Sequence, residues 1–282
     1  MIRYIVPGFC LFHTRLTRRL DRVSWVIVNP LAILLLSYVF TDLSLPFLLV
    51  GFPLGFLCFL SIYETGYIEN DVVTVKGEDR PTVRFSREEA MRIEESYWPL
   101  IAWKVAIALL LLMSLTLWVR YGGEAARVGL FVGCLVAARF FFRIHNSIRN
   151  RWNILTYLGL SVLKYLSLPL LFGGEGRTLE LVLLTVTMFP LVRTVEHATK
   201  PLYRFPGLRR FVGNFDTFRV KYYCILFALA WTAALLWGFQ PDVPFLLLYG
   251  YFLAFRIGAL VAVRLLRYQR TSHTAYEDPV EP

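Results

Sequence analysis

The sequence has few charged residues and lacks the short motifs that mark many enzymes. Charged residues make up 18% of the 282 residues, compared with about 25% in an average soluble protein. The chain contains no G-x-S-x-G, H-E-x-x-H, G-x-x-x-x-G-K or C-x-x-C pattern. No motif therefore points to a nucleophile-elbow hydrolase, a zincin, a P-loop enzyme or a dithiol oxidoreductase. The spacing of the four cysteines fits no disulfide framework or zinc site: Cys10, Cys58, Cys134 and Cys224.

Apolar residues dominate instead, and they are grouped in long runs. They make up 57% of the chain, and the mean hydropathy is +0.55. Several runs approach the roughly 20 residues that a helix needs to cross the bilayer core. The sequence therefore predicts an all-α, polytopic transmembrane bundle of eight, or at most nine, spans. The eight runs are 23–42, 46–64, 99–119, 127–143, 154–173, 178–194, 222–239 and 243–264.

The basic residues predict the orientation of the bundle. Most of the 30 Lys and Arg residues fall before the first run, after the last one, or in the loops that follow even-numbered runs. Cytoplasmic segments are enriched in Lys and Arg, so both termini should be cytoplasmic, and a bacterial inner membrane is the expected location. This bias accounts for the net charge of +10 without a nucleic-acid partner. The first run is too long for a cleavable signal peptide.

Three regions follow from this topology. Residues 1–22 form a basic, amphipathic cytoplasmic N-terminus, residues 23–266 form the bundle, and residues 267–282 form a polar cytoplasmic tail. Two cytoplasmic loops are long, at about 65–98 and 195–221. Function is expected in these loops and in the helix ends that meet them.

The first long loop begins with acidic residues. If the second span continues as a helix, Glu64, Tyr67 and Asp71 share one face. Carboxylate and amide oxygens suit Mg²⁺, which is commonly held by one or two carboxylates together with substrate phosphates. Four residues are candidate Mg²⁺ ligands: Asn70, Asp71, Glu78 and Asp79. The alternative is that these are solvated loop charges.

The same stretch resembles the first aspartate-rich motif of the UbiA superfamily of intramembrane prenyltransferases, N-D-x-x-D-x-x-x-D followed by a basic turn and R-P. Asn70, Asp71, Arg80 and Pro81 match that motif, whereas Thr74 replaces the second aspartate. Glu78 replaces the last aspartate, and the stretch is about five residues shorter. The resemblance implies a UbiA-like fold, Mg²⁺, an isoprenoid or polyprenyl (di)phosphate, catalytic roles for Glu64 and Asp71, and a phosphate contact at Arg80.

The end of the sixth span supplies the counterpart of the second motif of that family, D-x-x-x-D. Glu196 stands at the first position as a third catalytic candidate, and Lys200 replaces the second aspartate as a candidate phosphate ligand. The segment Asn214–Asp216 is an alternative acidic site. It is followed by two further candidate phosphate ligands, Arg219 and Lys221. His197 is either a base or a helix cap.

A basic stretch at the end of the fourth span completes the candidate site. Arg139, Arg143 and Asn146 recur at helical spacing, and Arg149 follows them. Arginine forks bind phosphate oxygens in a bidentate manner, and the loop after the fourth span is also basic in the resembling family. The alternative is that these residues only anchor the helix at the cytoplasmic surface.

Three basic residues fall within apolar runs and need a partner there. Lys104, near a helix end, is expected to reach the interface. Lys164 and Arg256 are expected to pair with Glu64, Glu180 or a phosphate.

The predicted function is therefore a UbiA-like, Mg²⁺-dependent transferase acting on a diphosphate-activated substrate at the cytoplasmic face. Transfer of a prenyl or polyprenyl group to an acceptor is the first reading. The second is phosphoribosyl or glycosyl transfer onto polyprenyl phosphate for cell-envelope glycan synthesis. A transporter or a non-catalytic membrane component is the third.

Overall fold

The computed structural model describes residues 2–77, 84–121, 127–148, 150–173, 176–237 and 243–265. Within these ranges all the regular elements are helices, and there is no strand. Eight helical segments are long and apolar enough to cross a membrane, which confirms the predicted all-α bundle of an integral, multi-pass protein. The spans are α2 with η2 and α3 (Arg19–Val26, Ile27–Leu31, Ala32–Phe40), α4 with η3 and η4 (Leu45–Ile68, Glu69–Val73, Thr74–Gly77), α6 (Tyr97–Tyr121), α7 (Val128–Ser147), α8 (Asn153–Phe172), α9 with α10 (Thr178–Met188, Pro190–Ala198), α12 (Phe215–Trp237) and α13 (Val243–Leu265).

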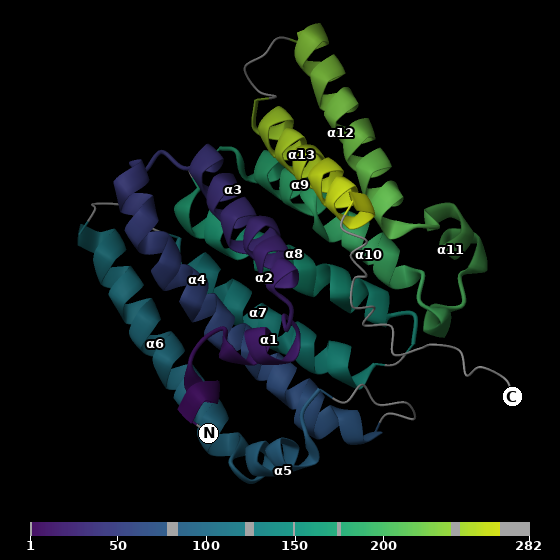
Figure 1. Cartoon of the computed structure of the whole chain (residues 1–282). Coiled ribbons are helices and arrows are strands. Elements are labelled where there is room, and N and C mark those ends of the chain that lie inside the picture. Colours follow the sequence, from purple (N-terminus) through teal and green to yellow (C-terminus); the bar gives the residue numbers. More distant parts are fainter. Residues whose placement is uncertain are drawn as a thin grey trace, which may run out of the picture.

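Helix α8 lies at the centre of the bundle (Figure 1), where it packs against α3, α7, α9 and α10. Helix α4 packs against α6 and α7, and α12 pairs with α13. The main core joins these groups through fully buried side chains such as Leu36, Leu48, Phe131, Leu184 and Phe252. Gly66 of α4 allows α7 to come close, because a Cβ there would lie 2.3 Å from Cγ of Phe142.

Two spans are interrupted within the bundle. The first contains the π-helical turn η2 around Pro30, which has no N–H to donate. The hydroxyl of Tyr165 donates to the carbonyl of Val28 at 2.7 Å, and that of Tyr251 donates to Ile27 at 2.6 Å. Tyrosines from other spans therefore satisfy carbonyl groups at this interruption.

The sixth span breaks at Phe189, between α9 and α10. Phe189 has φ −150° and ψ −49°, outside helical geometry, and Pro190 starts α10. Tyr222 and Tyr223 of α12 donate to the carbonyls of Thr187 and Met188, both at 2.6 Å. The amino-terminal end of α10 consequently lies inside the span.

Five short helices lie outside the spans. They are η1 (Ile2–Ile5), α1 (Phe9–Thr14), α5 (Arg87–Glu95), η5 (Pro201–Tyr203) and α11 (Pro206–Val212). Ser86 and Glu89 form a capping box at the start of α5. A second apolar cluster, which includes Tyr4, Ile68 and Ile93, packs η1 and α5 against the end of α4. Both predicted long loops thus contain folded helical segments.

Candidate functional site

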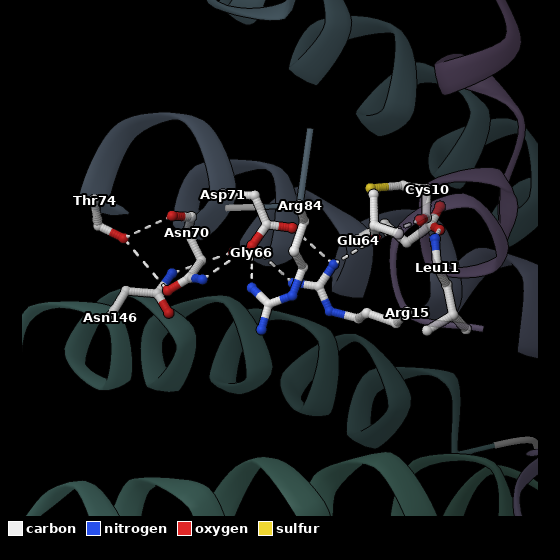
Figure 2. Close-up of polar contacts among 11 residues, drawn as sticks. Cys10, Leu11, Arg15, Glu64, Gly66, Asn70, Asp71, Thr74, Arg84 and Asn146 are labelled. Atoms are coloured by element: carbon white, nitrogen blue, oxygen red, sulfur yellow. Dashed lines mark hydrogen bonds and ion pairs between the residues drawn. The ribbon is translucent and has the colours of Figure 1, made fainter. Parts of the chain in front are cut away.

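The acidic face at the end of α4 exists as predicted, and the N-terminal segment covers it. The helix continues past Glu64 and turns into η3 at Glu69. Glu64 is fully buried and accepts hydrogen bonds from the backbone N–H groups of Gly8 at 2.9 Å and Leu11 at 2.8 Å. It therefore caps the start of α1, and Figure 2 shows it beside Cys10 and Leu11.

The ammonium of Lys104 completes the environment of Glu64 at 2.8 Å, and both side chains are fully buried. The expectation that Lys104 reaches the interface was wrong, because Lys104 points inward to a carboxylate that would otherwise be buried without a cation. The expected pairing of Lys164 or Arg256 with Glu64 or Glu180 was also wrong, since Glu180 pairs with Arg177. This geometry favours a structural role for Glu64 over the predicted catalytic one.

Asp71 lies between two arginines from separate segments (Figure 2). Its carboxylate is 2.8 Å from Nη1 of Arg15 and 2.7 Å from Nη1 of Arg84, and its side chain is fully buried. The guanidinium of Arg15 also lies 3.9 Å from the ring centroid of Tyr67. Asn70 donates to Oδ1 of Asp71 at 3.1 Å. Asp71 is thus a buried anchor for two cations, and the alternative of a solvated loop charge was wrong for this residue.

The described residues do not form a magnesium site as they are arranged. No group of three or more His, Cys, Asp or Glu side chains converges within those ranges. Both oxygens of Asp71 already face guanidinium groups. The predicted ligands Glu78 and Asp79 lie outside the described residues, as do the predicted phosphate contacts Arg80 and Arg149. Magnesium binding therefore stays a prediction.

Glu196, near the end of α10, is held in the same way as Asp71. Arg219 of α12 binds it through two nitrogens, with Nη2 at 2.7 Å from Oε2. Arg193, one turn back on α10, contacts the same carboxylate. Arg219 also reaches Asp216 at 3.2 Å. Asn214, part of the alternative acidic site, caps α12 by accepting hydrogen bonds from the N–H groups of residues 216 and 217.

Lys200 lies near one arginine of each acidic centre. It follows α10 and is exposed. Partial removal of its ammonium from water, together with the nearby guanidinium groups of Arg193 and Arg84, lowers the pKa of Lys200 to about 8. Arg84 is bound to Asp71 and Arg193 to Glu196. Lys200 is thus within electrostatic range of one arginine bound to each of the two predicted acidic residues. We call Asp71, Glu196 and the cations bound to or near them, Arg15, Arg84, Arg193, Lys200 and Arg219, the basic cluster.

His197 has a well-defined set of partners beside this cluster. Its ring stacks on Tyr157 of α8, with centroids 4.1 Å apart and planes 4° from parallel. Its Nε2 lies 2.7 Å from the hydroxyl of Tyr203 and 3.2 Å from Oδ1 of Asn153. Arg193 interacts with the phenol of Tyr157. These contacts fix the ring in place, and the role of His197 as a base stays a prediction.

The residues on the basic face of α7 have different surroundings. Asn146 is buried and donates to the carbonyl of Gly66 at 3.2 Å. Arg139 pairs with Glu69, and Arg139 and Arg143 line an open groove of about 330 Å³ with the exposed side chains Val136 and Phe140. Within the described residues no contact joins these two arginines to the basic cluster, so their phosphate role stays a prediction. Lys221 is exposed on α12, and its predicted phosphate role is also untested.

No protein-family model, curated protein or solved structure matches this chain. The resemblance to the UbiA superfamily therefore stays a prediction that rests on the residues quoted for it.

Proposed function

We propose that this chain is an intramembrane transferase whose basic cluster binds the phosphate or diphosphate group of an activated, isoprenoid-like substrate. The observation that carries the proposal is that Asp71 and Glu196 are buried and bound by arginines, with Lys200 near one arginine of each pair. Each carboxylate holds two arginines. The basic cluster contains five cations and two carboxylates, and positive charge is left for a ligand even when Asp216, which pairs with Arg219, is counted.

The chemistry of the cluster suits phosphate oxygens. Guanidinium groups present planar forks to phosphate, and an ammonium adds a compact charge with three donors. Asp71 and Glu196 keep the arginines oriented and limit their mutual repulsion while the site is empty of ligand. Residual charge inside a membrane bundle is costly and usually marks a ligand or transport path.

Prenyl transfer is the first form of the proposal, supported by the resemblance at Asn70, Asp71, Arg80 and Pro81. The bond between the first prenyl carbon and the diphosphate oxygen breaks, and the diphosphate leaves with the electron pair of that bond. A nucleophilic atom of the acceptor forms the new bond to this carbon and loses a proton to water. Arg84, Arg193 and Lys200 would stabilise the charge that develops on the leaving oxygen.

The second form is phosphoribosyl or glycosyl transfer onto polyprenyl phosphate. The observation that favours it is the number of cations: Arg256 also lies near Glu196 and Arg219, and Lys164 lies near Arg193. Two phosphorylated substrates would use more of this charge than one. The interrupted first and sixth spans are a feature shared with many transporters and support the transport alternative.

The proposed location is a bacterial inner membrane with both termini in the cytoplasm. The distribution of Lys and Arg supports it. The basic cluster would then open towards the soluble, diphosphate-bearing substrate, while the lipid-soluble partner enters from the bilayer.

Release of pyrophosphate tests the function directly. The purified protein is incubated with geranylgeranyl diphosphate, or with phosphoribosyl diphosphate, together with a lipid extract. Pyrophosphate release that depends on both the protein and the extract supports a transferase. The donor that releases it shows whether prenyl transfer or phosphoribosyl transfer takes place. No release with either donor, although pyrophosphate binds, would favour the transport alternative.

Asp71→Asn distinguishes an arginine anchor from a metal ligand. The variant keeps the shape of the side chain and frees Arg15 and Arg84 to bind an anion. We expect pyrophosphate to bind without Mg²⁺ as tightly as in the wild type, or up to about 10-fold more tightly. Isothermal titration with and without Mg²⁺ measures this. Binding that requires Mg²⁺ in the wild type and disappears in Asp71→Asn would instead assign Asp71 to the metal.

The low pKa of Lys200 predicts that its contribution to binding is lost above pH 8. The ammonium is mostly protonated at pH 7 and mostly neutral at pH 9, so the part of the affinity that it supplies should fall roughly 10-fold over this range. Lys200→Arg keeps its charge at both values and serves as the control. The ratio of wild-type to Lys200→Arg affinity for pyrophosphate should therefore fall between pH 7 and 9. A constant ratio would contradict the role of Lys200.

A further inference from the structure

Lys164 lies on the inward face of the central helix. Leu160 and Leu168, one turn to either side of it, are 4% and 1% exposed, whereas Leu155 on the opposite face is 54% exposed. Lys164 itself is half-buried, and so is Tyr157, two turns back on the same side of α8. Its residual exposure therefore faces the interior of the bundle and not the lipid.

Lys164 has aromatic neighbours but no acidic one. Its Nζ lies 5.1 Å from the ring centroid of Tyr165 and 5.9 Å from that of Phe189. No carboxylate of the described ranges lies within ion-pair distance of it. The nearby charged group is another cation, Arg193. By contrast, the ammonium of Lys104, also deep in the bundle, has its own carboxylate.

Two further features place positive charge around the same point. Phe189 is the residue at which the sixth span breaks, so the amino-terminal end of α10, the positive end of its dipole, lies close by. Arg256 of α13 is 6% exposed and lies near Glu196 and Arg219, and its Nε has no hydrogen-bond partner within the described part of the chain. Arg256 and Arg193 are both close enough to Tyr165 to interact with it electrostatically.

We propose that Lys164, together with Arg256 and the start of α10, forms a second anion site that binds the oxyanion of a lipid-soluble substrate. Tyr157, which stacks on His197 beside the basic cluster, is seven residues from Lys164, or about 10 Å along α8. This second site therefore lies deeper in the bundle than the basic cluster. The aromatic rings around Lys164 suit an apolar chain next to the charged group.

The inference deepens the proposed function, because it specifies that the second substrate carries an acidic group. The shared chemistry is an oxyanion on an isoprenoid chain, either a phosphate monoester or a carboxylate. An ammonium without an acid partner in an apolar span is costly unless a ligand pairs with it.

The experiment uses the full chain in detergent with saturating pyrophosphate, so that the basic cluster is occupied. Binding of farnesyl monophosphate, farnesoic acid and farnesol is then measured by isothermal titration. We expect at least one of the two anions to bind at least 10-fold more tightly than farnesol, and Lys164→Met to remove that difference. Lys164→Arg should retain most of it. Equal binding of all three ligands, or no effect of Lys164→Met on the anions, would overturn the inference.

Two readouts separate this result from other causes. Pyrophosphate should bind Lys164→Met and the wild type with affinities within about 2-fold, because the basic cluster is intact. If pyrophosphate does not bind the wild type, the proposed function itself is contradicted, independently of Lys164. The thermal stability of ligand-free Lys164→Met should equal or exceed that of the wild type, since the change removes an unpaired charge. A marked loss of stability would show that Lys164 has a partner within the protein and would overturn the inference.

Discussion

Lys104→Met is expected to lower the free energy of unfolding by about 3–5 kcal/mol, the usual cost of removing one partner of a buried ion pair. Glu64 and Lys104 are both fully buried, 2.8 Å apart. In the variant, the carboxylate of Glu64 would stay in an apolar bundle with only the N–H groups of Gly8 and Leu11 as partners. Chemical unfolding in mixed micelles measures the loss.

Lys76→Met is the matched control, because Lys76 also pairs with a glutamate, Glu94, but with both side chains about half exposed. Exposed pairs contribute about 0–1 kcal/mol, so this variant should be close to the wild type. The double variant Glu64→Gln/Lys104→Met removes both charges and should recover part of the loss. Equal stability of the two single variants would show that Glu64 and Lys104 do not form the buried pair.

The double variant Arg84→Gln/Lys200→Gln is expected to weaken pyrophosphate binding by about 100-fold or more. Each charge-assisted hydrogen bond to an anion contributes about 1.5–3 kcal/mol. Arg84 is bound to Asp71, and Lys200 is within electrostatic range of Arg84 and Arg193. Isothermal titration at pH 7 gives the affinity.

Lys221→Gln is the control for this loss. Lys221 is an exposed lysine on α12, and its removal lowers the net charge without touching the basic cluster. The variant should bind pyrophosphate within about 2-fold of the wild type, because exposed charges at a distance are screened by salt. A similar loss in Lys221→Gln and in the double variant would mean that pyrophosphate responds only to the overall charge.

The fold could be predicted from the sequence because the bilayer imposes a strict length on apolar helices. All eight runs correspond to spans, and the helix that contains Glu64 continues past it as expected. The ends of the elements were less predictable. The span predicted to end at residue 143 continues to Ser147, because arginines at a helix end do not stop the helix.

The candidate site was predicted only in part. The sequence identified Asp71, Glu196, Lys200 and Arg219; in the structure Arg219 binds Glu196, whereas Asp71 binds two other arginines. It did not identify Arg15, which lies 56 residues from Asp71 in the chain. Pairs of this kind depend on tertiary packing and leave no periodic signal in one sequence.

Two further residues of the site, Arg84 and Arg193, were counted only as part of the positive-inside bias. A basic residue that anchors a helix and one that binds a buried carboxylate look the same in the sequence. The useful signal was Glu196, since a carboxylate at a membrane-embedded helix end needs cations near it. A search for those cations would have led to Arg193, three residues before it.

Binding of pyrophosphate to the wild-type protein, read as a thermal shift at pH 7 with and without Mg²⁺, tests the central claim most directly. A ligand at 100 times its Kd stabilises the native state by about 2.7 kcal/mol. We predict a clear shift without Mg²⁺ that is absent in Arg84→Gln/Lys200→Gln. No shift in the wild type, with or without Mg²⁺, would contradict a phosphate-binding site between Asp71 and Glu196.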